Sequence, residues 1–210
     1  MEILGKLFGS EARVRMLRLF FLNPDTIFDA GDIAQKTKTK PAVVRREISV
    51  IQSVGIIRRC SFPKEINRVG KITKSNKGKK KITAGWCLDK TFSHGDHLRN
   101  LLVSASFFKK NDILSKFKNA GRIKLLVISG IFIKDENSRI DIFIVGDGLK
   151  KGAIDSILRS FEAEAGKELR YSVLDTKEFK YRLDMYDKFV RDILDYPHET
   201  IIDRLGTGIF

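Results

Sequence analysis

Cysteines are scarce in this sequence and long apolar segments are absent, and each shortage narrows the class of protein. Only Cys60 and Cys87 occur among 210 residues, so no disulfide framework is expected and a reducing, cytoplasmic environment is the simplest one. The longest apolar run, 125–133, is interrupted by Ser129 and Gly130, and it is far shorter than the roughly 20 residues of a membrane-spanning helix. The first eight residues do not form a basic leader followed by a long apolar stretch. We therefore expect a cytoplasmic protein without a membrane partner.

Signatures of metal and nucleophile chemistry are also missing. His94 and His97 follow the segment that holds the two cysteines, but no close cysteine pair accompanies them and the spacing fits no common zinc site. No Gly-rich phosphate loop followed by Lys and Ser or Thr occurs, and no Ser, His and Asp arrangement forms a nucleophile motif. We expect no metal, no cofactor and no intact catalytic site.

Charge is plentiful and unevenly distributed. The net charge is +14, and residues 1–120 hold 25 Lys and Arg against 10 Asp and Glu, whereas residues 121–210 hold 15 against 16. Lys and Arg that neutralise phosphates release condensed counterions, so a nucleic acid is the natural partner of the basic part. An anionic membrane surface is the competing partner.

Length and composition allow two cores, because 210 residues with 15 Phe exceed what one small domain needs. Two domains are therefore expected, at 1–110 and 111–210, with 109–111 as the candidate linker. The helix and strand patterns given below predict an α+β protein.

Apolar spacing in the first half predicts three helices. The first covers 10–22 and the second 29–37, and a polar turn follows at 38–40. The third begins at Pro41, which suits the first turn of a helix, and its apolar residues recur at steps of four, three and three until Gly55.

Short strands follow the third helix. Residues 56–62 and 82–88 predict the two arms of a hairpin, and ten Lys or Arg stand with a single acid from Arg58 to Lys81. A further helix is predicted over 92–108.

This order of helices, turn and basic hairpin resembles the winged helix-turn-helix family over about residues 8–90. The resemblance depends on the segment from Asp32 to Arg59, in which a recognition helix is followed by a Gly-Ile-Ile turn into the first wing strand. It implies that the third helix enters the major groove of double-stranded DNA.

The third helix supplies the candidate base-reading residues. If Val44, Ile48 and Ile51 face the core, the opposite face points to DNA. That face holds Ala42, Val43, Arg45, Arg46 and Ser49. Arg45 or Arg46 suits a bidentate bond to guanine O6 and N7.

Phosphate contacts are expected on either side of this helix. At its start stand Lys38, Thr39 and Lys40, where helix N-H groups also favour phosphate. The basic loop adds Lys64, Arg68, Lys71, Lys74, Lys77, Lys79, Lys80 and Lys81. The alternative interpretation is a solvated helix face and a solubilising insert.

The second half alternates helix and strand and predicts a small α/β layer. Strands are expected at 123–128, 140–145 and 169–174, and helices at 112–120, at 151–165 and from the capping residue Asp175 to Pro197.

The segment 125–148 in this half resembles the minimal nucleotidyltransferase domain of the DNA polymerase beta superfamily, over about residues 112–205. In that family a Gly-Ser turn follows the first strand, and an Asp-hydrophobic-Asp pair on the second strand, with a third carboxylate on a later strand, holds two metal ions.

This chain departs from the pattern at three places. Gly130 matches the glycine, but Ile131 replaces the serine, and Arg139 replaces the first Asp, so that only Asp141 matches. The third strand has no carboxylate. Two-metal phosphoryl transfer needs acids around both ions, so we expect a noncatalytic domain. In one interpretation Asp141 is a structural residue, which caps a turn or pairs with Arg139 or a neighbouring lysine. In the other, Arg139 and Asp141 form a pocket that binds a nucleotide as an effector.

The leading hypothesis is a DNA-binding transcription regulator whose second domain forms a homodimer or binds a nucleotide or protein effector. The alternatives are an active nucleotidyltransferase that docks nucleic acid through its basic half, and an RNA-binding protein.

Overall fold

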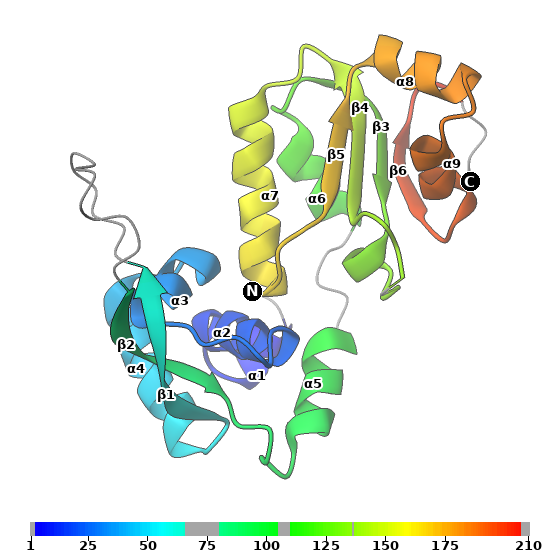
Figure 1. Cartoon of the computed structure of the whole chain (residues 1–210). Coiled ribbons are helices and arrows are strands. Elements are labelled where there is room, and N and C mark those ends of the chain that lie inside the picture. The colour runs from blue at the N-terminus through cyan, green and yellow to red at the C-terminus, as the bar shows by residue number, and fades with distance from the viewer. Residues whose placement is uncertain (1–2, 66–79, 105–109, 136, 207–210) are drawn as a thin grey trace, which may run out of the picture. The chain divides into compact units, whose positions relative to one another are not determined.

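A computed structural model describes residues 3–65, 80–104, 110–135 and 137–206 (Figure 1). The fold is mixed α+β, and the chain divides into two compact units, Met1–Leu102 and Val103–Phe210. The division falls eight residues before the boundary expected after residue 110. Each unit is described by itself.

The first unit begins with helices, of which the last three were predicted from the sequence. They are α1 (Ile3–Leu7), α2 (Glu11–Leu22), α3 (Ala30–Thr37) and α4 (Pro41–Ser53). The Ser10 side chain caps α2 by accepting a hydrogen bond from the N-H of Arg13, and Asp29 and Asp32 form a reciprocal capping box on α3. Lys38 takes the left-handed conformation that ends α3.

A hairpin and a fifth helix complete this unit. Strands β1 (Ile57–Glu65) and β2 (Lys80–Leu88) pair antiparallel, and α5 covers Gly95–Ser104. The backbone of Phe28, in the segment between α2 and α3, forms a bridge with Trp86 and so extends the hairpin sheet. Glycine is required at position 85, next to the bridge, because a Cβ there would lie 2.7 Å from the carbonyl oxygen of Phe28.

The helices of the first unit enclose its core. Phe20 packs edge-on against Phe28, with the ring centres 5.7 Å apart. The buried Arg18 donates from Nε to the carbonyl oxygen of Leu102 and joins α2 to α5. Other buried core residues include Val14, Leu17, Ile33, Val44, Ile48 and Ile51.

The second unit is a four-stranded sheet with helices on both faces. Its helices are α6 (Lys110–Phe117), α7 (Lys151–Ala165), α8 (Thr176–Asp184) and α9 (Lys188–Asp195), and a short 3-10 turn, η2, covers Gly130–Phe132. The strands β3 (Arg122–Ile128), β4 (Ile142–Asp147), β5 (Tyr171–Leu174) and β6 (Glu199–Asp203) lie in the order β5-β4-β3-β6. Only the β4 and β5 pair is parallel.

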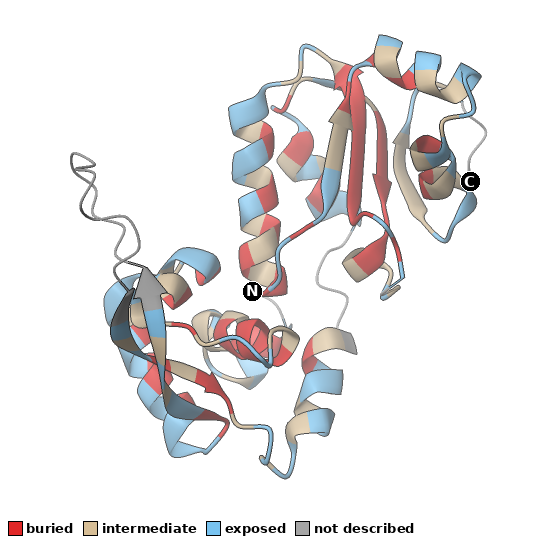
Figure 2. Cartoon of the chain, viewed as in Figure 1, coloured by how far each residue is buried: buried red, intermediate tan, exposed pale blue. Residues whose placement is uncertain are grey.

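Two apolar layers cover this sheet. Phe117 of α6 and Phe161 of α7 pack on one face, and Phe179 of α8 and Val190 of α9 pack on the other. Strands β3 and β4 are therefore buried on both sides, and Figure 2 shows them mostly as buried. This double burial explains their nearly continuous apolar sequences.

Most helices and strands expected from the sequence are confirmed, but the prediction of one long helix after Asp175 is wrong. The chain breaks at Tyr186, which has a left-handed φ of 53°, into α8 and α9, and Asp187 caps α9. The break lets both helices place an apolar face on the sheet. Helix α1 and strand β6 were not anticipated, because each is too short to show a periodic pattern.

One disulfide is present, which the sequence did not predict. Cys60 and Cys87 are joined across the hairpin, with their Cα atoms 6.2 Å apart. The count of cysteines excludes a framework of several bridges, but a single bridge depends on the strand register, which the count does not reveal.

Candidate nucleic-acid interface

Helix α4 has one buried and one exposed face. Val44, Ile48 and Ile51 are buried in the unit, as the apolar spacing predicted. Ala42, Arg45, Arg46 and Ser49 are exposed, whereas Val43 is half-buried. Val43 therefore lies at the border between the two faces, one turn before buried Glu47.

The start of α4 is held by the turn before it. The hydroxyl of buried Thr37 donates to the carbonyl of Ile33, and the half-buried Thr39 donates to the carbonyl of Thr37. Lys38 and Lys40 flank Thr39 and are exposed. Two cations thus stand beside the N-terminus of α4, where the first N-H groups and the helix dipole favour an anion.

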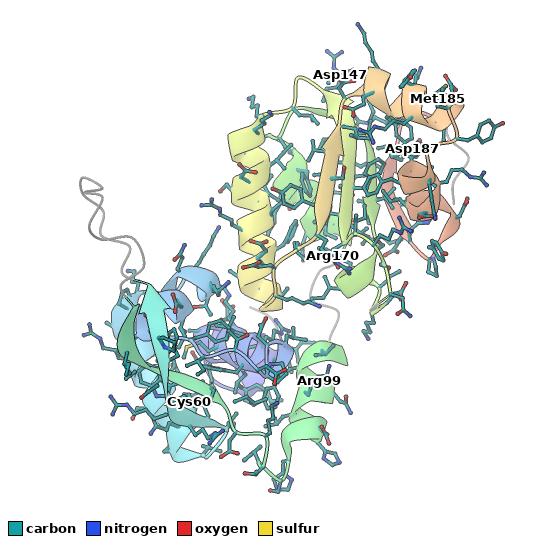
Figure 3. All side chains as sticks on the ribbon, in the orientation of Figure 1. Cys60, Arg99, Asp147, Arg170, Met185 and Asp187 are labelled. Carbon is teal, nitrogen blue, oxygen red and sulfur yellow. A yellow bond between two sulfur atoms is a disulfide. The ribbon has the colours of Figure 1, made fainter. Side chains whose placement is uncertain are left out.

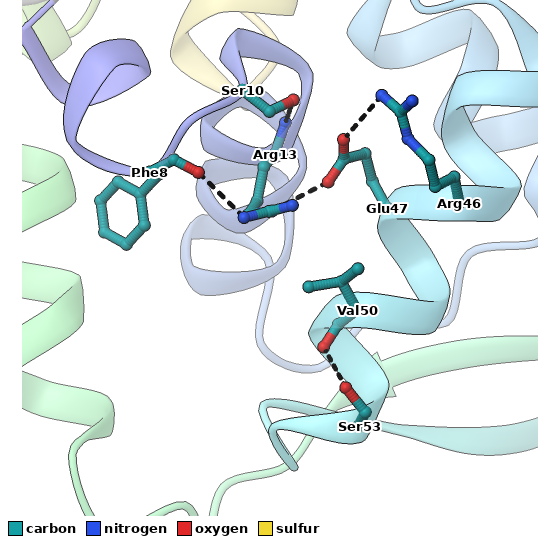
Figure 4. Close-up of polar contacts among 7 residues, drawn as sticks. All are labelled: Phe8, Ser10, Arg13, Arg46, Glu47, Val50 and Ser53. Atoms are coloured by element: carbon teal, nitrogen blue, oxygen red, sulfur yellow. Dashed lines mark hydrogen bonds and ion pairs between the residues drawn. The ribbon is translucent and has the colours of Figure 1, made fainter.

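A charged residue occupies the buried face of α4. Glu47 is 1% exposed, and its Oε2 accepts from Nε of Arg13 on α2 at 2.8 Å, while its Oε1 accepts from a guanidinium nitrogen of Arg46 at 3.3 Å (Figure 4). Burial raises the pKa of Glu47, but hydrogen bonds from Arg13, Ser10 and Arg46 outweigh it and leave the pKa below its usual value. Glu47 is therefore a carboxylate at neutral pH.

This ion pair secures the orientation of the helix. Arg13 also donates to the carbonyl of Phe8 at 2.9 Å, so its guanidinium links α2, α4 and the residues before α2 (Figure 4). Glu47 and Arg13 were not predicted from the sequence. The available signal was an acid that falls on the apolar stripe of the helix, because such an acid needs a buried partner.

A side-chain hydrogen bond joins the hairpin to α4. The indole Nε1 of Trp86 on β2 donates to Oε1 of Gln52 on α4 at 2.9 Å. Arg59 of β1 is the direct cross-strand partner of Trp86 and therefore lies on the same face of the hairpin. Arg59 is exposed, so it adds a cation beside α4.

The basic loop is described only at its two ends. Lys64, Lys80 and Lys81 are in β1 and β2, and their side chains are not described. The remaining expected phosphate contacts lie outside the described residues, and they are Arg68, Lys71, Lys74, Lys77 and Lys79.

In the second unit, three of the four residues compared with the nucleotidyltransferase motif lie together: Gly130, Ile131 and Asp141. Asp141 is buried, and its Oδ1 accepts from the N-H of Ile131 at 2.9 Å, while its Oδ2 accepts from the N-H of Arg170 at 2.8 Å. Gly130 has a φ of 57°, and a Cβ there would collide with Oδ1 of Asp141. Both carboxylate oxygens are thus used to hold the turn after β3 against the start of β5.

Of the structural roles expected for Asp141, the structure shows the turn cap, through the N-H of Ile131, and not the pairing with Arg139. Nε of Arg170 lies 3.5 Å from Oδ2 of Asp141, and Arg139 instead pairs with Asp192 of α9 at 2.8 Å. Arg139 and Asp141 are two residues apart, but successive turns of the chain direct them to different partners. Figure 3 shows Arg170 at the start of β5, at the opposite end of the sheet from Asp147.

Neither a metal site nor a membrane span is found in the described part of the chain. No group of three or more His, Cys, Asp and Glu residues there is placed to hold a metal ion. Among the helices in the same ranges, none has the length and apolar character needed to cross a bilayer. None of the known protein families, curated proteins or solved structures matches this chain.

Proposed function

We propose that the first unit is a winged helix-turn-helix domain that binds double-stranded DNA, and that the chain is a cytoplasmic transcription regulator. The observation that carries the proposal is the exposed face of α4, with Arg45 and Arg46, braced against the hairpin through Trp86 and Gln52. The bridge of Phe28 to Trp86 supports it, because it adds the short strand that precedes the second helix of a winged helix.

Rigid attachment matters for reading bases. A recognition helix distinguishes bases only if its side chains are held in register with the groove, and each good bidentate contact is worth roughly 1–3 kcal/mol. The Arg13–Glu47 ion pair secures α4 on its buried side, and the Trp86–Gln52 hydrogen bond secures its C-terminal part. These two supports favour sequence-specific binding over a merely solvated basic face.

The two arginines of α4 have different surroundings. The guanidinium of Arg46 is held at Oε1 of Glu47, which partly offsets its charge. Arg45 is exposed, and among the described residues no ion pair is recorded for it. We therefore assign base reading to Arg45, and phosphate positioning to Lys38, Lys40, Arg59 and the hairpin lysines.

We further propose that the second unit is a noncatalytic, nucleotidyltransferase-like domain that serves dimerisation, effector binding or partner binding. Catalysis in that family needs free carboxylates at the position of Asp141, and here both oxygens accept backbone N-H groups. Arg139 stands where the family has the first Asp of the pair, and its ion pair with Asp192 supports a structural role for this residue too. These contacts also argue against a nucleotide effector pocket built on Arg139 and Asp141.

Selection of binding sites from random duplex DNA tests the function. We expect the full chain to enrich a defined motif, and Arg45→Ala to lose preference at one position of it. Arg159→Ala is the matched control, because Arg159 is exposed on α7 in the second unit. Equal binding to all duplexes, or stronger binding to single-stranded or double-stranded RNA of random sequence, contradicts the proposal.

A further inference from the structure

We propose that Cys60 and Cys87 form a reversible thiol–disulfide site that reacts with peroxides and controls the DNA-binding hairpin. The existence of the site depends only on the hairpin, whereas the control of DNA binding depends on the function proposed above. The disulfide joins β1 to β2 at the part of the hairpin nearest the helices (Figure 3).

The register explains how the two cysteines meet. They are not direct cross-strand partners, because Cys60 lies opposite Gly85 and Cys87 lies opposite Arg58. Cys87 is two residues after Gly85, the partner of Cys60, and side chains alternate between the faces of a strand. Both cysteine side chains are therefore on one face of the hairpin. Such diagonal neighbours are usually about 7–8 Å apart, but here the Cα separation is 6.2 Å, which a disulfide can span.

Gly85 provides the space for this diagonal contact. Gly85 lies opposite Cys60 and has no Cβ, so no cross-strand side chain stands between Cys60 and its diagonal neighbour Cys87. The place that a Cβ would take is filled by the carbonyl oxygen of Phe28 and the side chains of Ile27 and Phe62. The same glycine allows the close approach of Phe28. One residue thus permits both the sheet bridge and the disulfide.

The surroundings suit a reactive thiol rather than an inert one. Cys87 is 8% exposed, whereas Cys60 is half-buried and is the sulfur that a small oxidant reaches. Arg58, which is exposed, shares the face of both cysteines and lies directly opposite Cys87. Positive charge beside a thiol favours the thiolate, which is the nucleophile in oxidation and exchange.

The chemistry balances with hydrogen peroxide as the oxidant. The Cys60 thiolate attacks one peroxide oxygen, the O–O bond breaks, and a sulfenic acid and water form after the leaving hydroxide takes a proton. The Cys87 thiol then attacks the sulfenic sulfur, so that the S–S bond forms and a second water leaves. A small dithiol reverses the bond by thiol–disulfide exchange and is itself oxidised to its cyclic disulfide.

The position of the bond connects it to the interface. Cys87 follows Trp86, whose indole is bonded to Gln52 of α4, and Cys60 follows Arg59 on the candidate interface. Forming or breaking the bond changes the constraint on the hairpin next to the contact that attaches it to α4. A disulfide in a reducing compartment is typically transient and redox-sensing, which agrees with this use.

The first experiment follows the thiols of the full chain without DNA. Free thiols are counted by a chromogenic disulfide reagent after treatment with excess dithiol and its removal and, separately, after treatment with hydrogen peroxide and its removal. We expect two thiols per native chain after dithiol and none after peroxide. On a non-reducing gel the oxidised protein should run as a single chain, without disulfide-linked dimers. Cys60→Ser and Cys87→Ser should each retain one thiol that yields no intramolecular bond.

The second experiment measures binding of the selected duplex by both redox forms. We expect Kd to differ by about tenfold between the forms of the native chain, and to be insensitive to redox treatment in Cys60→Ser and in Cys87→Ser. The fluorescence of Trp86, the only tryptophan, should change with oxidation in the native chain but not in either variant.

The outcomes separate the two proposals. Thiols that stay free after peroxide, a bond that native protein keeps in excess dithiol, or a bond formed only between chains overturns the redox site. A normal thiol cycle with equal Kd in both forms overturns its control of DNA binding. Absence of duplex binding in both forms overturns the proposed function, while the thiol count still decides on the site.

Discussion

Glu47 of α4 and Arg13 of α2 form an ion pair of 2.8 Å in which the carboxylate is almost completely buried and the guanidinium is partly exposed. The pair places a charge on the core side of the helix whose other side carries the candidate DNA contacts. Removing either member leaves the partner with an unmet hydrogen bond close to the core.

Glu47→Gln should therefore lower the free energy of unfolding by about 1–3 kcal/mol, because a neutral amide cannot replace both charged hydrogen bonds. Denaturant unfolding of the full chain measures it. Glu11→Gln is the control, since Glu11 is exposed on α2, and it should change stability little. An equally small effect of both changes would show that the ion pair does not support α4.

The same ion pair predicts a dependence of stability on pH. The pKa of Glu47 in the folded protein is below its ordinary value of 4.5, so the unfolded chain binds the proton more readily. The stabilisation is complete above about pH 4.5 and is lost as pH falls through the lowered pKa. Native stability should decrease more steeply there than that of Glu47→Gln, and parallel curves would contradict the assignment.

Gly85→Ala should destabilise the first unit by about 1–3 kcal/mol. The new methyl would meet the carbonyl oxygen of Phe28 at 2.7 Å and the side chain of Ile27 at 2.9 Å, so the bridge between Phe28 and Trp86 must shift. Thermal unfolding monitored by Trp86 fluorescence checks this. Gly152→Ala is the matched control, because Gly152 is in helix α7 with open space around it, and alanine there should raise stability slightly.

Asp141→Ala should destabilise the second unit by about 2–4 kcal/mol, because it removes the acceptor of the N-H groups of Ile131 and Arg170. Gly130→Ala should also destabilise the unit, because alanine would have to adopt a left-handed backbone conformation and its methyl would collide with Oδ1 of Asp141. Thermal unfolding measures both changes.

The native chain, in turn, should transfer no nucleotide from radiolabelled triphosphates with Mg²⁺ or Mn²⁺. Label incorporation that disappears in a folded Asp141→Ala protein would instead favour the enzyme hypothesis.

Arg45→Ala and a triple change of Lys79, Lys80 and Lys81 to Ala should affect duplex binding differently. The arginine change should cost about 1–3 kcal/mol on the selected sequence and little on random DNA. The lysine change should weaken both alike and reduce the dependence of Kd on salt, because fewer counterions are released. Fluorescence anisotropy at several salt concentrations measures both, and identical losses on specific and random DNA for both variants would contradict the recognition-helix assignment.

The sequence by itself determined the local elements. Apolar steps of three and four residues predicted α2, α3, α4 and α7, and alternation or continuous apolar runs predicted the hairpin, β3 and β4, because burial of one face requires that spacing. The buried and exposed faces of α4 followed for the same reason. The uneven charge was also a property of the sequence, and it still motivates a nucleic-acid partner.

Only the tertiary structure decided which polar side chains meet. Glu47 pairs with Arg13 across 34 positions, Arg139 pairs with Asp192 instead of Asp141, and Cys60 and Cys87 form a disulfide that their number and spacing did not predict. The break at Tyr186 and the late strand β6 also depend on packing against the sheet. Such contacts join residues far apart in the chain. The packing of the elements sets the distance and direction between two side chains, and local spacing in the sequence encodes neither.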